Sequence, residues 1–266
     1  METIIERVEL PSFRTEIARR GSGPTLVLIQ GLGTDHRAWG PVIDHLAPHL
    51  RCVAFDNRGV GGASPVGADT TIERLADDAA EVIESLGEGP VHVAGVSLGG
   101  GIAMRVASRR PDLVKSLALH STAARPDGRL LSVLDFRRSI LERGMGAEML
   151  RPFVALWAWS PTGMELARLP EGAAEVDRLD IEEYRQHLRV AAEQWMTDDE
   201  LAKITAPTLV TVGSADILTT IEHARDLHRG IRDAELVVVE GGGHAYYSES
   251  AALFASLQLG WTLRHD

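Results

Sequence analysis

Short apolar segments alternate with helix-like segments along most of this chain. Six nearly continuous apolar runs, typical of strands buried on both faces, lie at 25–30, 51–56, 91–94, 113–119, 208–212 and 235–239. The clearest helix covers 70–86, with a capping box formed by Thr70 and Glu73 and a stop at Gly87. Strands that alternate with helices predict an α/β fold with a mostly parallel sheet and helices on both faces.

Two features modify this simple alternation. The segments 3–10 and 13–19 show alternating polarity and predict a hairpin, which brings the expected sheet to eight strands. Residues 125–200 contain several helical stretches and little strand signal. A tract of this length is too long for a loop in a compact domain, so we expect a helical lid inserted after the sixth strand. The predicted domains are therefore a core, 1–124 and 201–266, and a lid, 125–200.

Composition limits the classes of partner and compartment. The net charge of −11 disfavours nucleic acid and anionic membranes and leaves a small molecule as the expected partner. The single cysteine, Cys52, excludes an intramolecular disulfide and favours a reducing cytoplasm. The first ten residues lack the pattern of a signal peptide, and no apolar stretch is long enough for a membrane span. The oligomeric state stays open.

The pentapeptide Gly95-Val96-Ser97-Leu98-Gly99 lies between a predicted strand and a predicted helix. This setting is typical of a nucleophile elbow, a tight turn that lifts a serine hydroxyl clear of the sheet. Side chains two residues before and after the serine would collide in such a turn, which explains the two glycines. The alternative is an ordinary glycine-rich turn, because the five-residue pattern also occurs by chance. A base and an acid elsewhere in the chain would favour the nucleophile elbow over the ordinary turn.

A serine nucleophile needs a base, and the base needs an orienting acid. Asp216 follows the strand 208–212, and His244 follows the strand 235–239 through three glycines. Both positions are at strand C-termini, where the crevice of an open α/β sheet lies. The alternatives are a turn aspartate and a surface histidine. The acidic run 198–200 precedes its strand, at the wrong end for chemistry, so we reject it.

Two backbone N–H groups are expected to bind the oxyanion. Leu98 follows the candidate nucleophile, and Leu32 lies in the loop after the strand 25–30. The glycines at 59, 61 and 62 do not open a helix and lack the lysine of a phosphate-binding loop, so we interpret 56–61 as a structural brace. No Cys/His cluster or H-E-x-x-H pattern suggests a metal, and we expect no cofactor.

Together these motifs resemble the α/β-hydrolase superfamily, and the resemblance covers essentially the whole chain. Within it, the loops at 30–35 and 95–100 resemble the esterase and lactonase branch that includes 3-oxoadipate enol-lactonases. Two positions depart from that pattern, since Gln30 stands where histidine is usual and Ala63 where serine is usual. The serine at 97 also separates the chain from haloalkane dehalogenases, which carry aspartate there.

The resemblance implies an ester or lactone hydrolase with the triad Ser97, His244 and Asp216 and no cofactor. Carbon–carbon bond hydrolases, thioesterases and cofactor-free perhydrolases or cyclases share the fold and remain alternatives. A non-catalytic small-molecule receptor is a further alternative, against which a complete triad argues.

Large apolar side chains gather in the predicted lid. Trp157 and Trp159 lie in an apolar tract, and Trp195 ends the apolar stripe of a helix capped by Asp180. These tryptophans could form the lid's own core, but a lid that excludes water must turn an apolar face toward the serine. We therefore expect them to roof the pocket. A compact, largely apolar ester or lactone, without high charge, is the expected substrate.

Overall fold

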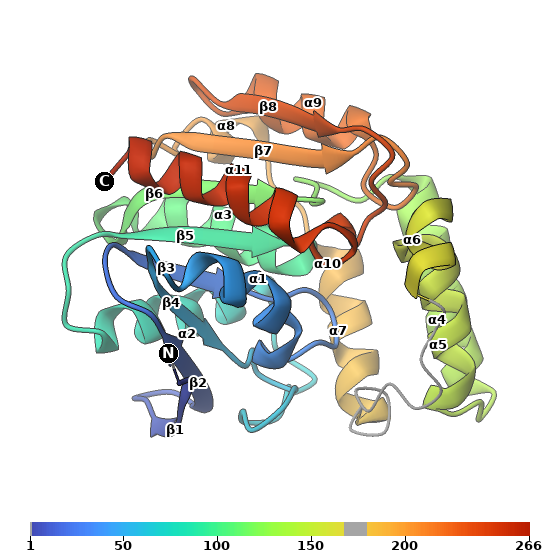
Figure 1. The fold of residues 1–266 in the computed structure, drawn as a ribbon. Helices are drawn as coiled ribbons and strands as arrows, with labels where there is room; N and C mark the ends of the chain where they lie inside the picture. Colours follow the sequence, from blue (N-terminus) through green and yellow to red (C-terminus); the bar gives the residue numbers. More distant parts are fainter. Residues whose placement is uncertain (1, 168–179) are drawn as a thin grey trace.

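The computed structural model describes residues 2–167 and 180–266, which include one eight-stranded sheet (Figure 1). Its strands, in chain order, are β1 (Ile4–Glu9), β2 (Arg14–Arg20), β3 (Thr25–Ile29), β4 (Arg51–Phe55), β5 (Val91–Val96), β6 (Val114–His120), β7 (Thr208–Gly213) and β8 (Glu235–Val239). The predicted mostly parallel, eight-stranded α/β sheet is confirmed. All eight strands lie within two residues of the expected segments.

The order of strands across the sheet is β1-β2-β4-β3-β5-β6-β7-β8. The β1–β2 and β2–β4 pairs are antiparallel, and every pair from β4 to β8 is parallel. The chain moves outward from β3 to β4, then returns to β5 on the other side of β3. This reversal leaves the loops after β3 and β5 diverging above the sheet, which is where α/β folds place ligands.

Helices cover both faces of the sheet (Figure 1). The helices of the described residues are η1 (His36–Trp39), α1 (Gly40–Leu46), α2 (Ile72–Ser85), α3 (Leu98–Arg109), η2 (Pro111–Leu113), α4 (Gly128–Glu142), α5 (Ala147–Ala158), α6 (Pro161–Ala167), α7 (Ile181–Glu193), α8 (Asp198–Leu201), α9 (Ile221–Gly230), α10 (Tyr246–Glu249) and α11 (Ala251–Arg264). Helices α1 and α11 pack on one face, and α2, α3 and α9 on the other. None of these helices is long and apolar enough to cross a membrane.

Helix α2 shows one small departure from expectation. Its N-cap is Thr71, whose side chain accepts a hydrogen bond from the backbone N–H of Arg74. The predicted capping box of Thr70 with Glu73 is therefore wrong by one residue. Thr70 Oγ1 instead accepts a hydrogen bond from Gly67 N, which ties down the preceding turn.

Helices α4 to α7 lie between β6 and β7 in the sequence and stand beside the ends of the strands (Figure 1). We call this segment, 125–200, the insertion; its residues 168–179 lie outside the described part of the chain. Helices α4 and α7 pack against each other around a small apolar cluster of their own, which includes Leu134, Tyr184 and Leu188. Asp180 caps α7 as expected, accepting hydrogen bonds from two backbone N–H groups of its first turn.

Candidate active site

Ser97 occupies the sharp turn between β5 and α3. Its backbone has φ 55° and ψ −120°. Residues other than glycine rarely adopt this conformation, which is typical of strained functional turns. A Cβ on Gly95 would lie 2.2 Å from the carbonyl oxygen of Gly99, and one on Gly99 would lie 2.2 Å from that of Ile29. Both positions therefore exclude any side chain. The glycines let the first turn of α3 press against β3 and β5, which holds the serine above the sheet.

The structure brings the three predicted triad residues together. His244 Nε2 lies 3.0 Å from Ser97 Oγ, and His244 Nδ1 lies 2.9 Å from Asp216 Oδ2. Ser97 follows β5, Asp216 follows β7 and His244 follows β8, so three parallel strands deliver the three groups to one edge. Each distance is within hydrogen-bonding range. The imidazole can thus exchange a proton with the serine on one side and donate to a carboxylate on the other.

Asp216 is held in place by its own loop. Its Oδ1 accepts hydrogen bonds of 2.9 Å from the N–H groups of Leu218 and Thr219, and its Oδ2 accepts one from Thr219 Oγ1. Burial alone would raise the pKa of this carboxyl, but the charge of His244 and these hydrogen bonds together lower it. Asp216 therefore stays a carboxylate that can orient His244 and stabilise its protonated form.

Two backbone N–H groups beside Ser97 have no hydrogen-bond acceptor among the described residues. One belongs to Leu98, the first residue of α3, and the other to Leu32, in the loop after β3. A Cβ on Gly31 would lie 3.3 Å from Ser97 Cβ, so the loop that carries Leu32 passes directly over the serine. The positive end of the α3 dipole adds to the field at this point. The arrangement suits a developing negative charge on oxygen.

Gln30 stabilises the loop that carries Leu32, residues 30–35, which we call the oxyanion loop after the role predicted for Leu32. Its side-chain Oε1 accepts hydrogen bonds from Gly31 N at 2.9 Å and Thr34 Oγ1 at 3.1 Å, while its backbone carbonyl accepts one from Asn57 Nδ2. The residue is almost fully buried. An amide can accept both hydrogen bonds at once. The replacement of the usual histidine by Gln30 therefore leaves the loop pinned at its start.

The insertion reaches the same loop through His187 of α7. Gly33 N donates to His187 Nδ1 at 3.4 Å, and His187 Nε2 lies 2.6 Å from the carbonyl oxygen of Arg58. Burial lowers the pKa of His187, and the hydrogen bond to Arg58 only partly offsets this effect. The neutral tautomer with hydrogen on Nε2 satisfies both partners. This histidine thus connects the insertion to the oxyanion loop and to the loop after β4.

A cavity of about 360 Å³ opens beside Ser97 and His244. The core contributes Leu32, Leu98 and Thr219 to its wall, and the insertion contributes Leu134, Trp159 and Gln194. More of this wall is apolar than polar. The volume is at the lower end of the range for small-molecule sites, so its size suits a compact molecule.

The three predicted tryptophans differ in their placement. Trp159, at the C-terminus of α5, lines the cavity. Trp157 lies outside the lining and packs edge-on against Phe136 within the insertion. Trp195 is 56% exposed and lies near the guanidinium of Arg125, so its predicted place at the cavity is wrong. The reason is that α7 ends at Glu193 and the chain then becomes extended, which turns Trp195 out of the helical stripe.

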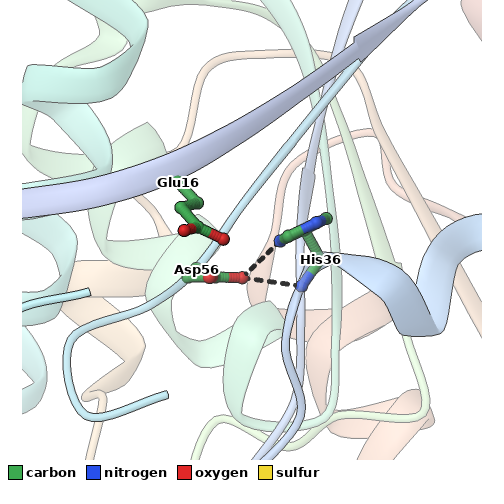
Figure 2. A group of neighbouring side chains, drawn as sticks. All are labelled: Glu16, His36 and Asp56. Carbon is green, nitrogen blue, oxygen red and sulfur yellow. Dashed lines mark hydrogen bonds and ion pairs between the residues drawn. The ribbon is translucent and has the colours of Figure 1, made fainter. Parts of the chain in front are cut away.

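Glu16, His36 and Asp56 form a separate cluster (Figure 2). Their possible ligand atoms lie within 4.8 Å of one another, so the described residues offer one geometric candidate for a cation. However, Asp56 Oδ1 already lies 2.7 Å from His36 Nδ1 and accepts from His36 N, and its Oδ2 accepts from Gly62 N. Burial would lower the pKa of His36, but Asp56 raises it overall. Both carboxylate oxygens of Asp56 are thus already occupied by hydrogen bonds, and the cluster acts as a brace.

Sequence reasoning missed three residues of this site: Thr219, His187 and Arg137, the last of which lines the cavity from α4. Thr219 had a local signal, because a threonine three residues after an aspartate in a turn often bonds to it. The other two sit on helical faces whose neighbours depend on how the insertion docks. The positions of these two residues in the sequence do not indicate which parts of the core they contact.

The sequence matches the family described as alpha/beta hydrolase fold over residues 24–251. It is 28% identical over 252 residues to RutD of Azorhizobium caulinodans, a protein assigned as a carbamate hydrolase, covering 91% of this chain and 92% of that protein. It is 37% identical over 117 residues to the (E)-2-((N-methylformamido)methylene)succinate hydrolase of Acinetobacter baylyi, covering 44% of each chain. The crystal structure of the enol-lactonase from Burkholderia xenovorans LB400 superposes with a TM-score of 0.86 at 25% identity, covering 96% of this chain and 99% of that one.

Proposed function

Because this chain belongs to the α/β-hydrolase fold family, we propose that it is a serine hydrolase that cleaves a compact ester or lactone through an acyl-enzyme. The observation that carries the proposal is the continuous line of contacts from Asp216 through His244 to Ser97, with spacings of 2.9 Å and 3.0 Å. A receptor with the same fold needs a cavity, but it does not need this alignment of nucleophile, base and acid.

The proposed mechanism begins with attack by Ser97 Oγ on the substrate carbonyl. His244 Nε2 takes the serine proton as the new bond forms, and Asp216 stabilises the imidazolium through Nδ1. The N–H groups of Leu32 and Leu98 bind the negative charge on the carbonyl oxygen. His244 then returns its proton to the leaving oxygen. A water molecule deprotonated by His244 releases the acyl group and restores Ser97.

The size of the cavity and its largely apolar wall favour a compact substrate with an apolar body. The structural relative named enol-lactonase supports an ester or lactone bond. The two sequence relatives are named for a carbamate and for an N-formyl compound, so a carbonyl bonded to nitrogen is the second candidate. The same triad can cleave either type of bond, because Ser97 attacks the carbonyl carbon and His244 protonates the leaving oxygen or nitrogen.

Hydrolysis of short 4-nitrophenyl esters tests the proposal. We expect the wild-type protein to release 4-nitrophenol from the acetate and butyrate esters, and Ser97→Ala to reduce kcat on the order of 10⁶-fold. Alanine is smaller than serine and preserves the turn, so circular dichroism and the melting temperature should match the wild type. A folded Ser97→Ala variant within tenfold of wild-type activity would exclude this serine as the nucleophile.

Matched 4-nitroanilides of the same acyl groups decide between the two bond types, because they release 4-nitroaniline only when the carbon–nitrogen bond breaks. The ester proposal expects a higher kcat/KM for the ester than for the anilide after correction for their uncatalysed rates. A reversed preference would assign the protein to carbon–nitrogen chemistry with the same triad.

A further inference from the structure

Two arginines in the described part of the chain are buried, and they differ in their partners. Arg105 is 4% exposed; its Nε donates to Glu73 at 2.8 Å and its Nη2 donates to the carbonyl oxygen of Trp195 at 2.7 Å. Arg137 is 7% exposed and forms no hydrogen bond or ion pair with any described residue. Its Nε is fully enclosed without an acceptor. Arg137 is thus a buried cation whose charge the described residues leave unbalanced.

An unpaired guanidinium is expensive to bury. Removing a charge from water costs several kcal/mol unless an opposite charge or hydrogen bonds replace the lost hydration. The Arg137 guanidinium lies over the ring of Trp157, whose centroid is 5.5 Å from the guanidinium carbon. Such a contact fixes the orientation of the group, but it supplies no acceptor for the N–H donors. The donors on the two Nη atoms, which are not enclosed as Nε is, therefore remain available to a ligand.

Arg137 lines the cavity that contains Ser97 and His244. Leu130 and Leu134 precede it on α4 at helical spacing and line the same cavity, so this face of the helix is turned inward. A molecule that fills a cavity of about 360 Å³ contacts both this wall and the serine. The guanidinium of Arg137 and the hydroxyl of Ser97 can therefore contact the same ligand.

The other charges at the cavity do not neutralise Arg137. Arg37 also lines the cavity, but its Nε donates to both oxygens of Asp35 at 3.0 Å. Among the described lining residues there is no aspartate or glutamate. The protein as a whole carries a net charge of −11, yet the described wall of this cavity presents the unpaired positive charge of Arg137. An anionic ligand is the chemical complement of such a cavity.

We propose that Arg137 binds a carboxylate group of the substrate, so that the protein selects compact esters or lactones that also carry a free carboxylate. The planar guanidinium fork matches the two oxygens of a carboxylate, and hydrogen bonds between charged groups are stronger than neutral ones. This inference rests on the proposed function, because it assigns the second end of the substrate that Ser97 attacks. It sharpens the expectation of a compact, largely apolar substrate without high charge: the body is apolar and one end is anionic.

Matched pairs of chromogenic esters test this selectivity. The anionic probes are the 4-nitrophenyl monoesters of succinic, glutaric and adipic acid, and in each neutral partner an isopropyl group replaces the free carboxylate. The two members of a pair have nearly the same shape and differ in charge. We expect wild-type kcat/KM to favour the anionic member at least about tenfold for one chain length. A preference for the neutral member at all three lengths would overturn the proposal.

Arg137→Met removes the charge and keeps a flexible side chain of similar length. We expect kcat/KM for the preferred monoester to fall about 10- to 100-fold, and that for its neutral partner to change less than about threefold. The matched control is Arg138→Met on the same helix, since Arg138 is exposed and pairs with Asp135 and Glu142. This control should change neither value. Arg137→Lys should recover part of the loss. Equal losses on both probes after Arg137→Met would contradict carboxylate binding.

Thermal stability separates ligand binding from a structural role. Because the charge of Arg137 is unpaired, Arg137→Met should melt at the same temperature as the wild type or higher. A lower melting temperature with equal losses on both probes would assign the arginine to packing of the insertion.

The two proposals can fail independently. If the wild type hydrolyses the neutral esters and Ser97→Ala does not, the serine hydrolase stands whatever Arg137→Met does. If the wild type hydrolyses no ester, the proposed function fails, and calorimetric titration with glutarate decides on Arg137 alone. At least tenfold weaker glutarate binding to Arg137→Met than to wild type would support the assigned carboxylate site, and equal binding or no binding to either would overturn it.

Discussion

The strand-end loops of the sheet and the helical insertion contribute to the same cavity in different ways. Ser97, Asp216 and His244 follow the parallel strands β5, β7 and β8 of one sheet, and hydrogen bonds of about 3 Å connect them. The insertion has a small apolar core of its own and meets the oxyanion loop through a longer contact, from Gly33 N to His187 at 3.4 Å. Under the proposed function, the sheet carries the chemistry, whereas the insertion selects the molecule on which it acts. Changes in the two regions should therefore have different consequences.

The largest effects should come from the base and the acid at the strand ends. We expect His244→Ala to lower kcat on the order of 10⁶-fold and Asp216→Asn on the order of 10⁴-fold, because each loss disables the same proton transfer. The double variant should be little worse than His244→Ala. Steady-state kinetics with 4-nitrophenyl butyrate measure all three. Strictly multiplicative losses would show that the two residues act separately.

Adding one methyl group should affect folding very differently in the two regions. Gly99→Ala places a Cβ 2.2 Å from the carbonyl oxygen of Ile29, so we expect the free energy of unfolding to fall by at least about 3 kcal/mol. Gly128→Ala, in the first turn of α4, meets nothing within 4 Å and should change that free energy by at most about 1 kcal/mol, toward greater stability. Urea denaturation followed by circular dichroism gives both values. Similar values for the two variants would mean that the elbow tolerates movement.

A third prediction concerns pH and the buried His120 of β6. Burial lowers its pKa to about 4, although the hydrogen bond that His120 Nε2 donates to Gln258 Oε1 partly opposes this change. Below about pH 6.5 the unfolded chain binds a proton at this histidine that the folded chain does not bind, so stability is lost as the pH falls from 6.5 toward 4. The loss amounts to about 3 kcal/mol at most. Because His120 lies in the sheet, this loss of stability should not depend on the insertion.

The comparison of wild type with His120→Asn isolates this effect. The excess stability of the wild type over the variant should shrink as urea melts are repeated from pH 7.5 down to pH 4.5. A constant difference across that range would show that the folded His120 takes up the proton as readily as the unfolded chain.

The smallest of the four effects should appear in the insertion, at Trp159. Because this ring lines the cavity, Trp159→Ala should change the ratio of kcat/KM between bulky and small esters by roughly tenfold, about 1.4 kcal/mol. Trp195→Ala is the matched control, since that ring is exposed away from the cavity. A panel of 4-nitrophenyl esters from acetate to octanoate provides the measurement. Equal changes from both substitutions would show that the insertion acts through its stability alone.

The difference between the regions also explains what could be predicted from the sequence. The strands were predictable because each buried strand is a short apolar run, and Ser97, Asp216 and His244 were predictable because each lies just after such a run. The steric constraint of the elbow acts on five adjacent residues, 95–99, so a short sequence motif is enough to indicate it. Thr71, which replaces the predicted cap Thr70, shows that element ends shift even where the element itself is clear.

The insertion could not be predicted in the same way. The direction of Trp195 depends on α7 ending at Glu193, and no strong stop residue marks that point. The roles of Arg137 and His187 depend on how α4 and α7 dock on the core, which involves residues more than a hundred positions apart. Helical periodicity indicates which face is buried, but it does not identify what lies opposite.

The central claim is that the sheet presents Ser97 as a nucleophile activated by His244, and covalent labelling tests it most directly. The wild type is treated with a fluorophosphonate, digested with trypsin and sequenced by mass spectrometry. We expect one label per chain on the peptide 75–105, with fragment ions placing it on Ser97 rather than Ser85. His244→Ala should label far more slowly. A label on another residue, or none on a preparation that hydrolyses esters, would contradict this assignment.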